Sequence, residues 1–188
     1  MPPATPQPNS QHMELGNFRA TLLEVKGLAF DVDGVLTNNQ VLIAPSGELL
    51  RPANTRDGYA LHQARLAGIP IAIITGGTSQ SLVKRYANLG IEYIYPGAHD
   101  KVQCLQEFCA CNDLAPAQVM YMGDDMPDLQ AMQLVGMPCC PLDACSEIQN
   151  IARYISPFRG GEGCVRDIVE QILKLQGHWP ANAADGRQ

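Results

Sequence analysis

The chain has 188 residues, of which 46% are hydrophobic, and this length favours one globular unit with a single substantial core. Its net charge of −6 and its total of only 13 Lys and Arg residues argue against a protein that binds nucleic acid or a membrane surface, because either would need a basic face. No stretch approaches the ~18 consecutive apolar residues of a membrane span.

The chain opens with MPPATPQPNSQHM, which is rich in Pro, Gln, Asn and Ser and lacks the basic and apolar regions of a signal peptide. We therefore expect residues 1–25 to form a flexible N-terminal tail and lead-in. The seven cysteines are an odd number in an otherwise ordinary composition, which indicates reduced thiols and a cytoplasmic protein.

Between residues 26 and 177, apolar stretches of strand length alternate with patterns of helical length. The predicted strands are 27–30, 69–74, 91–95, 119–122, 137–140 and 153–156. The predicted helices are 58–67, 78–89, 101–111, 127–134, 144–152 and 163–176. This order predicts one α/β domain at 26–177, with a parallel sheet flanked by helices. Residues 178–188 have little periodicity, and we expect a C-terminal tail.

One segment, residues 40–56, breaks the alternation. It reads as two short strands around Pro45, Ser46 and Gly47, which predicts a β-hairpin that projects from the sheet.

Polar residues follow four of the predicted strands, at the edge where open parallel sheets bind their ligands. In chain order they are Asp31 and Asp33, then Thr75, Gly76 and Gly77, then Lys101, and finally Asp124, Asp125 and Asp128. A single Asp in such a place is more often a turn residue or a helix cap. Acids grouped at the ends of two strands would repel one another unless a cation lies between them, and ligands that offer only oxygen suit Mg²⁺.

In sequence, these residues resemble the four motifs of the haloacid dehalogenase superfamily of aspartyl-phosphate phosphohydrolases. The motifs are DVDGVLT (31–37), IITG (73–76), Lys101 and GDDMPD (123–128). The resemblance covers about residues 26–177 and implies a Rossmann-like core, a Mg²⁺ cofactor and a covalent aspartyl-phosphate.

The resemblance also implies a role for each of these residues. Asp31 would be the nucleophile, and Asp33 would protonate the leaving oxygen and then deprotonate the attacking water. Asp31, Asp124 and the backbone carbonyl of Asp33 would bind Mg²⁺. Lys101 and Thr75, with the amides of Gly76 and Gly77, would bind phosphoryl oxygens, while Asp125 and Asp128 would orient waters or Lys101. Family members that preserve their aspartyl-phosphate for ion pumping carry threonine in place of Asp33, so a phosphatase is favoured over an ATPase.

The spacing of the motifs leaves no room for a cap domain. The hairpin and one helix fill the segment between Asp33 and Thr75, and one helix and one strand fill the segment between Thr75 and Lys101. Because a capless enzyme cannot exclude water from its site alone and the hairpin has an exposed edge, we expect an oligomer in which neighbouring chains cover the site.

With no room for a cap domain and with such a hairpin, the chain is similar to the 3-deoxy-D-manno-octulosonate 8-phosphate (KDO 8-phosphate) phosphatases. Members of this family are homotetramers that act in lipopolysaccharide precursor synthesis in Gram-negative bacteria. The matching stretches are NTRDGYA (54–60), AIITGG (72–77), Arg85, YMGDDMPD (121–128) and GGEGCVRDIVEQIL (160–173). By this resemblance the substrate pocket is lined by Asn54, Thr55, Arg56, Asp57 and Gly58, with Arg85 near the phosphate or the sugar acid. The loop of Gly160, Gly161, Glu162 and Gly163 would approach the active site of a neighbouring chain.

Two residues depart from the family pattern. Many members carry arginine where this chain has Gly77, and many carry arginine where it has His62. We expect His62 to be either a substrate contact or a solvated helix residue. A phosphatase for a nine-carbon, sialic-type acid 9-phosphate therefore stays open as an alternative, as does a non-catalytic binding or scaffold subunit with the same fold.

Overall fold

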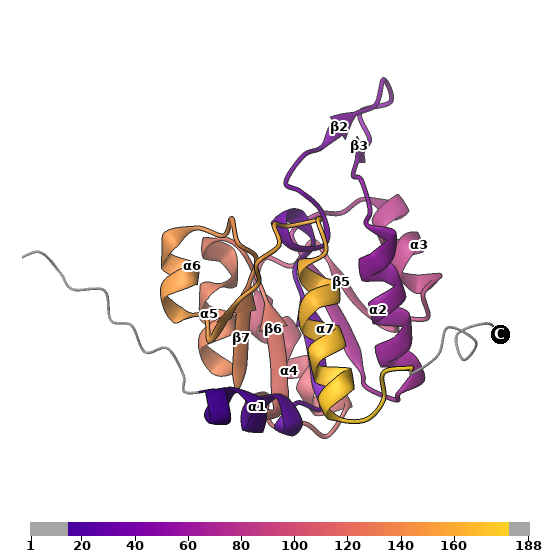
Figure 1. The fold of residues 1–188 in the computed structure, drawn as a ribbon. Coiled ribbons are helices and arrows are strands. Elements are labelled where there is room, and N and C mark those ends of the chain that lie inside the picture. Colours follow the sequence, from indigo (N-terminus) through magenta and orange to yellow (C-terminus); the bar gives the residue numbers. More distant parts are fainter. Residues whose placement is uncertain (1–14, 181–188) are drawn as a thin grey trace, which may run out of the picture.

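The computed structural model describes residues 15–180, and its centre is a six-stranded sheet in which every pairing is parallel (Figure 1). The strand order is β5-β4-β1-β6-β7-β8. The strands are β1 (Gly27–Phe30), β4 (Ile71–Thr75), β5 (Tyr93–Pro96), β6 (Val119–Met122), β7 (Met137–Cys140) and β8 (Tyr154–Ile155). This arrangement confirms the predicted α/β fold.

Helices cover both faces of the sheet. They are α1 (Leu15–Glu24), α2 (Thr55–Leu66), α3 (Gln80–Ala87), α4 (Lys101–Cys111), α5 (Leu129–Leu134), α6 (Ser146–Ile151) and α7 (Cys164–Leu175). Because successive strand residues point to opposite faces, Leu28 and Phe30 of β1 pack in the core with α1, α2, α3 and α7, whereas Ala29 packs in the core with α4, α5 and α6. No helix of residues 15–180 has the length and apolarity needed to cross a membrane.

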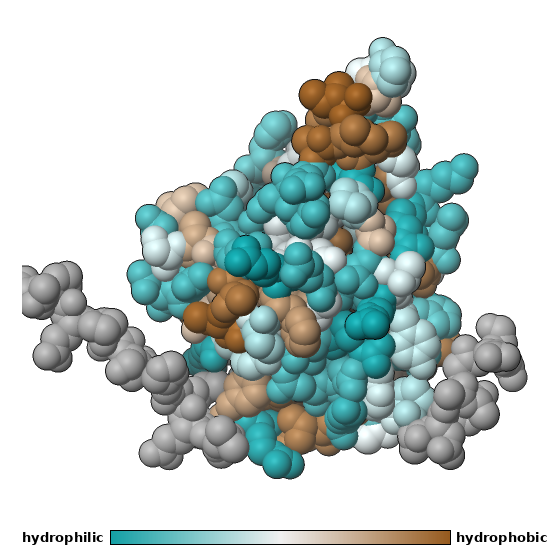
Figure 2. Space-filling model, turned by 45° about the horizontal axis from the view of Figure 1, so that its top comes forward, coloured by the Kyte–Doolittle hydropathy of each residue, from teal (hydrophilic) through white to brown (hydrophobic). Residues whose placement is uncertain are grey.

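The predicted hairpin is present as strands β2 (Leu42–Ile43) and β3 (Leu49–Leu50), which pair in antiparallel register and stand away from the sheet (Figure 1). Leu42 and Ile43 are 69% and 70% exposed. Figure 2 shows the resulting apolar patch near the tip of the hairpin. Within residues 15–180, no cap domain covers the sheet edge beneath it.

The N-terminal boundary predicted at residue 26 is too late. Helix α1 lies within the expected lead-in and packs on α7. Gln176 Nε2 donates hydrogen bonds to the backbone oxygens of Leu22 (3.1 Å) and Val25 (2.8 Å). Both Leu22 and Val25 are buried, so α1 belongs to the packed domain. Residues 1–14 of the predicted tail lie outside the described part of the chain.

The predicted C-terminal tail also begins too early. The backbone amides of His178 and Trp179 both donate to the oxygen of Leu173, and the Trp179 ring lies 4.4 Å from the guanidinium carbon of Arg166. Residues 178 and 179 therefore continue the packing of α7, whereas 181–188 lie outside the described residues.

Helix α2 begins three residues before its predicted start at residue 58. Asn54 is its N-cap, and its Oδ1 accepts hydrogen bonds from the backbone amides of Arg56 (2.8 Å) and Asp57 (3.4 Å). Such a cap satisfies amides that have no partner within the first helical turn.

Candidate active site

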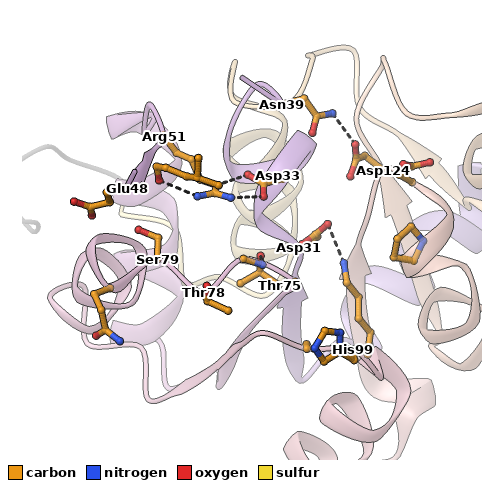
Figure 3. Close-up of a pocket in the computed structure, with 18 of the residues that line it drawn as sticks. Asp31, Asp33, Asn39, Glu48, Arg51, Thr75, Thr78, Ser79, His99 and Asp124 are labelled. Carbon is orange, nitrogen blue, oxygen red and sulfur yellow. Dashed lines mark hydrogen bonds and ion pairs between the residues drawn. The ribbon is translucent and has the colours of Figure 1, made fainter. Parts of the chain in front are cut away.

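An open cavity of about 1130 Å³ lies at the carboxyl edge of the sheet, below the hairpin (Figure 3). Residues after β1, β4, β5 and β6 line it, as do residues of the hairpin. The structure therefore brings together the residues that the motifs predicted there: Asp31, Asp33, Thr75, Gly76, Gly77, Lys101, Asp124 and Asp125.

An ion-paired cluster of three buried groups extends from the wall of the cavity into the protein. Lys101 Nζ lies 2.9 Å from Asp31 Oδ2 and 2.7 Å from Asp128 Oδ1. Burial lowers the pKa of Lys101, but the charges of Asp31 and Asp128 outweigh burial and leave that pKa above its ordinary value. Burial, with a further contribution from the charge of Asp128, raises the pKa of Asp31 to about 8, although Lys101 opposes the shift. One ammonium therefore does not compensate these carboxylates fully, and the site favours a further cation.

Three carboxylates, Asp31, Asp124 and Asp128, place oxygen atoms within 4.8 Å of one another and could hold a metal ion. Both oxygens of Asp128 are already engaged: Oδ1 accepts from Lys101 and from the Tyr121 hydroxyl (2.8 Å), and Oδ2 accepts from the Asp124 amide (3.2 Å). Asp128 thus holds Lys101 in place, while Asp31 and Asp124 are the better candidates for metal ligands. Burial raises the pKa of Asp124 to about 6, and this donor set of carboxylate oxygens fits Mg²⁺.

The turn after β1 depends on Gly34, which has a φ of 83°. A Cβ at this position would overlap Asp124 Oδ2. Glycine therefore serves two purposes here, because it tolerates the left-handed backbone and lets the turn approach Asp124 closely.

Asp33 is held by a residue that the sequence analysis missed. Arg51, just after β3, donates from Nε to Asp33 Oδ1 (2.6 Å) and from Nη2 to Asp33 Oδ2 (2.9 Å), a bidentate pair that Figure 3 marks with dashed lines. These hydrogen bonds raise the pKa of Arg51 above its ordinary value. The one signal in the sequence was that Arg51 is the only Lys or Arg between residues 27 and 55.

Thr75 ends β4 with its side chain buried, and its Oγ1 accepts a hydrogen bond from the Gly77 amide (3.1 Å). A Cβ added at Gly76 would meet nothing within 4 Å. Small residues in this loop leave the backbone open to an approaching anion.

Asp125 is exposed at the rim, and its Oδ1 accepts from the Met126 amide. A second missed residue, Asn39, donates from Nδ2 to Asp124 Oδ2 (3.0 Å). Asn39 comes from the loop before the hairpin, so no motif spacing indicated this contact.

Most residues assigned to the substrate pocket by resemblance do not line the main cavity of the single chain. These are Asn54, Thr55, Arg56, Asp57, Gly58, His62 and Arg85. Arg85 lines a smaller pocket of about 200 Å³ behind the hairpin stem, and Arg56 lines a separate depression beside Glu162 and Gly163.

Asp57 has a structural contact within the single chain. Its side chain is buried, with 1% of the residue exposed, and Oδ1 accepts a hydrogen bond from the Arg166 amide (2.7 Å) in the first turn of α7. Asp57 therefore caps α7 from the neighbouring helix, because the N-cap residue of α7 is Gly163, which has no side chain to do so.

The loop of Gly160, Gly161, Glu162 and Gly163 packs against the active-site turn of its own chain. The Gly161 amide donates to Val35 O (2.9 Å), and the Asn54 Nδ2 donates to Gly161 O (2.9 Å). A Cβ at Gly160 would overlap Gly34 O. This loop therefore supports the turn that carries Asp33.

Comparisons with known proteins identify the family of the chain. Residues 82–166 match the family model described as haloacid dehalogenase-like hydrolase. The chain is 36% identical over 152 residues, 81% of each chain, to the 3-deoxy-D-manno-octulosonate 8-phosphate phosphatase KdsC of Yersinia pestis.

Solved structures of KDO 8-phosphate phosphatases also superpose on the chain. The Yersinia pestis phosphatase superposes with a TM-score of 0.83 at 34% identity, covering 85% of this chain and 86% of that one. The Moraxella catarrhalis phosphatase, solved with a magnesium ion, a phosphate ion and KDO, superposes with a TM-score of 0.87 at 30% identity, covering 93% of this chain and 100% of that one. The chain therefore belongs to the haloacid dehalogenase-like hydrolases, in the family of KdsC-type KDO 8-phosphate phosphatases.

Proposed function

We propose that the protein hydrolyses KDO 8-phosphate to KDO and inorganic phosphate in the cytoplasm, as a step of lipopolysaccharide precursor synthesis. The observation that carries this proposal is the cluster of Asp31, Lys101 and Asp124 in one cavity, with Asp33 at its wall. The identity to KdsC phosphatases supports the choice of substrate, as does the KDO bound to the Moraxella catarrhalis relative.

In the proposed reaction, a carboxylate oxygen of Asp31 attacks phosphorus, and the bond from phosphorus to the sugar oxygen breaks. Asp33 gives its proton to that sugar oxygen, then takes a proton from the water that hydrolyses the aspartyl-phosphate. Lys101 keeps its proton and faces the phosphoryl oxygens. Mg²⁺, held by Asp31, Asp124 and the backbone carbonyl of Asp33, would supply charge compensation for the phosphoryl group.

We also propose a homotetramer in which neighbouring chains complete the pocket. The exposed apolar residues Leu42 and Ile43 of the hairpin support an interface there, because water-exposed apolar patches of this kind usually bind another protein surface. Asn54, Thr55, Arg56, Gly58, His62 and Arg85 would then contact the sugar acid, and the loop 160–163 would approach the neighbour's site.

The test is phosphate release from KDO 8-phosphate with Mg²⁺, measured for the wild type and for Asp31→Asn. The variant should lose nearly all activity because an amide cannot form the aspartyl-phosphate. Asp113→Asn is the matched control, since Asp113 is an exposed carboxylate away from the cavity. A wild type that releases phosphate from no sugar phosphate would favour the scaffold alternative.

The nine-carbon alternative rests on Gly77 and His62, which replace arginines common in the family. The same assay with a nine-carbon 2-keto acid 9-phosphate decides between the substrates. A higher kcat/KM for that compound than for KDO 8-phosphate would replace the substrate proposed here.

A further inference from the structure

The cavity contains a second cationic side chain besides Lys101, namely Arg51. Lys101 directs two of its three N–H donors to Asp31 and Asp128, at 2.9 and 2.7 Å, which leaves at most one for a phosphoryl oxygen. The same cavity is also lined by Glu48 and Asp125. Because five carboxylates line this cavity, a phosphate dianion that enters it gains from any positive charge beyond that of Lys101 and Mg²⁺.

Arg51 retains hydrogen-bonding capacity after its contacts in the protein. A guanidinium has five N–H donors. Nε and Nη2 each donate to Asp33, and Nη1 donates to Leu49 O (3.0 Å). One N–H on Nη1 and one on Nη2 have no hydrogen-bond partner among the described residues.

The Nη2 end of Arg51 lies over the loop that follows Thr75. A Cβ built on Gly77 would be 3.2 Å from Arg51 Nη2 and 3.4 Å from Thr75 Oγ1. The absence of a side chain at Gly77 therefore gives the guanidinium its place beside the loop. Arg51 reaches this place from the hairpin stem, and its side chain is largely buried, with 10% exposed.

We propose that Arg51 binds the phosphoryl group of the substrate, with the free N–H on Nη2 donating to a phosphoryl oxygen held beside Thr75 and the Gly77 backbone. The same guanidinium keeps its two hydrogen bonds to Asp33 and so orients this carboxyl group, whose oxygens each retain a lone pair for the proton that Asp33 transfers. Arg51 supplies from the hairpin a guanidinium on the side of the cavity where Gly77 has no side chain. This inference deepens the proposed function and rests on it for the identity of the phosphate monoester.

The test uses inorganic phosphate as the probe, titrated by calorimetry into the full-length protein with saturating Mg²⁺. Loss of a charge-assisted hydrogen bond to phosphate should weaken binding about 10- to 100-fold in Arg51→Ala and in Arg51→Gln. Arg65→Ala is the matched control, because Arg65 is exposed on α2 outside the cavity, and it should bind phosphate within about twofold of the wild type.

Two results would overturn the proposal. One is phosphate binding within twofold of the wild type in either folded Arg51 variant. The other is a parallel loss of Mg²⁺ affinity measured without phosphate, which would mean that Arg51 acts only by supporting the site. Circular dichroism checks folding, and Arg51→Gln decides if Arg51→Ala does not fold, since its amide can still donate to Asp33.

Because inorganic phosphate carries no sugar, failure of the proposed function is distinguishable from failure of this inference. A protein that binds phosphate through Arg51 but hydrolyses neither sugar phosphate would overturn the proposed function alone.

Discussion

The buried carboxylate of Asp57 makes the stability of the domain depend on pH. Burial raises the pKa of Asp57 to about 6 from an ordinary value of 3.8, although the hydrogen bond from the Arg166 amide opposes the shift. The folded protein therefore binds this proton more tightly than the unfolded chain does. The resulting stabilisation is complete below pH 3.8 and is lost as the pH rises through 6.

The magnitude follows from the two pKa values. A difference of about 2.2 pKa units corresponds to ~3 kcal/mol in the free energy of unfolding, and about 2 kcal/mol of this falls between pH 4.5 and pH 7.5. Asn at position 57 does not titrate, and its side-chain oxygen can still accept from the Arg166 amide. The stability of Asp57→Asn relative to the wild type should therefore rise by about 2 kcal/mol over this pH range.

The assay is urea unfolding of both proteins, followed by circular dichroism at half-unit steps of pH and at one fixed protein concentration. The difference between the two free energies of unfolding isolates the titration of Asp57, because the other groups are common to both proteins. A difference that stays constant within about 0.5 kcal/mol would refute the assignment of a raised pKa to this carboxylate.

Three other changes give direct tests. Gly34→Ala should reduce Mg²⁺ affinity at least about tenfold, because its Cβ would displace the Asp124 carboxylate; unchanged calorimetric Mg²⁺ binding would contradict this. Leu42→Asp combined with Ile43→Asp should convert the proposed homotetramer to a smaller species in light scattering, and a wild-type mass would contradict an interface at the hairpin. Lys101→Met should abolish phosphate release and lower the free energy of unfolding in EDTA by about 3 kcal/mol or more, because two buried carboxylates lose their cation. Mg²⁺ should restore part of that stability in thermal unfolding. A melting temperature that equals that of the wild type and does not depend on the metal would contradict this prediction.

The sequence predicted the sheet well because its inner strands are continuous apolar runs. The ranges 27–30, 119–122 and 137–140 were assigned with the bounds that the structure has. All residues of these strands are buried, and buried parallel strands are nearly uniform in hydrophobicity. The meeting of the polar residues that follow these strands could also be predicted, because the carboxyl ends of parallel strands share one edge of the sheet.

Contacts between distant segments could not be predicted from local pattern. Helix α1 follows a Pro-rich opening, and its position depends on Gln176, far along the chain. The bond from Arg166 to Asp57 joins two helices 109 residues apart. Arg51 reaches Asp33 only because the hairpin folds back over the sheet edge. In each case the deciding interaction is tertiary, and periodicity carries no information about it.

The packing of the 160–163 loop against the turn after β1 affects when the active site can form during synthesis. The turn that carries Asp33 is made early, but the Gly161 amide, which donates to Val35 O, is made much later in synthesis. Contacts this far apart in sequence form late in folding. A nascent chain on the ribosome therefore holds the turn of Asp33 without this support until residues 160–163 have emerged.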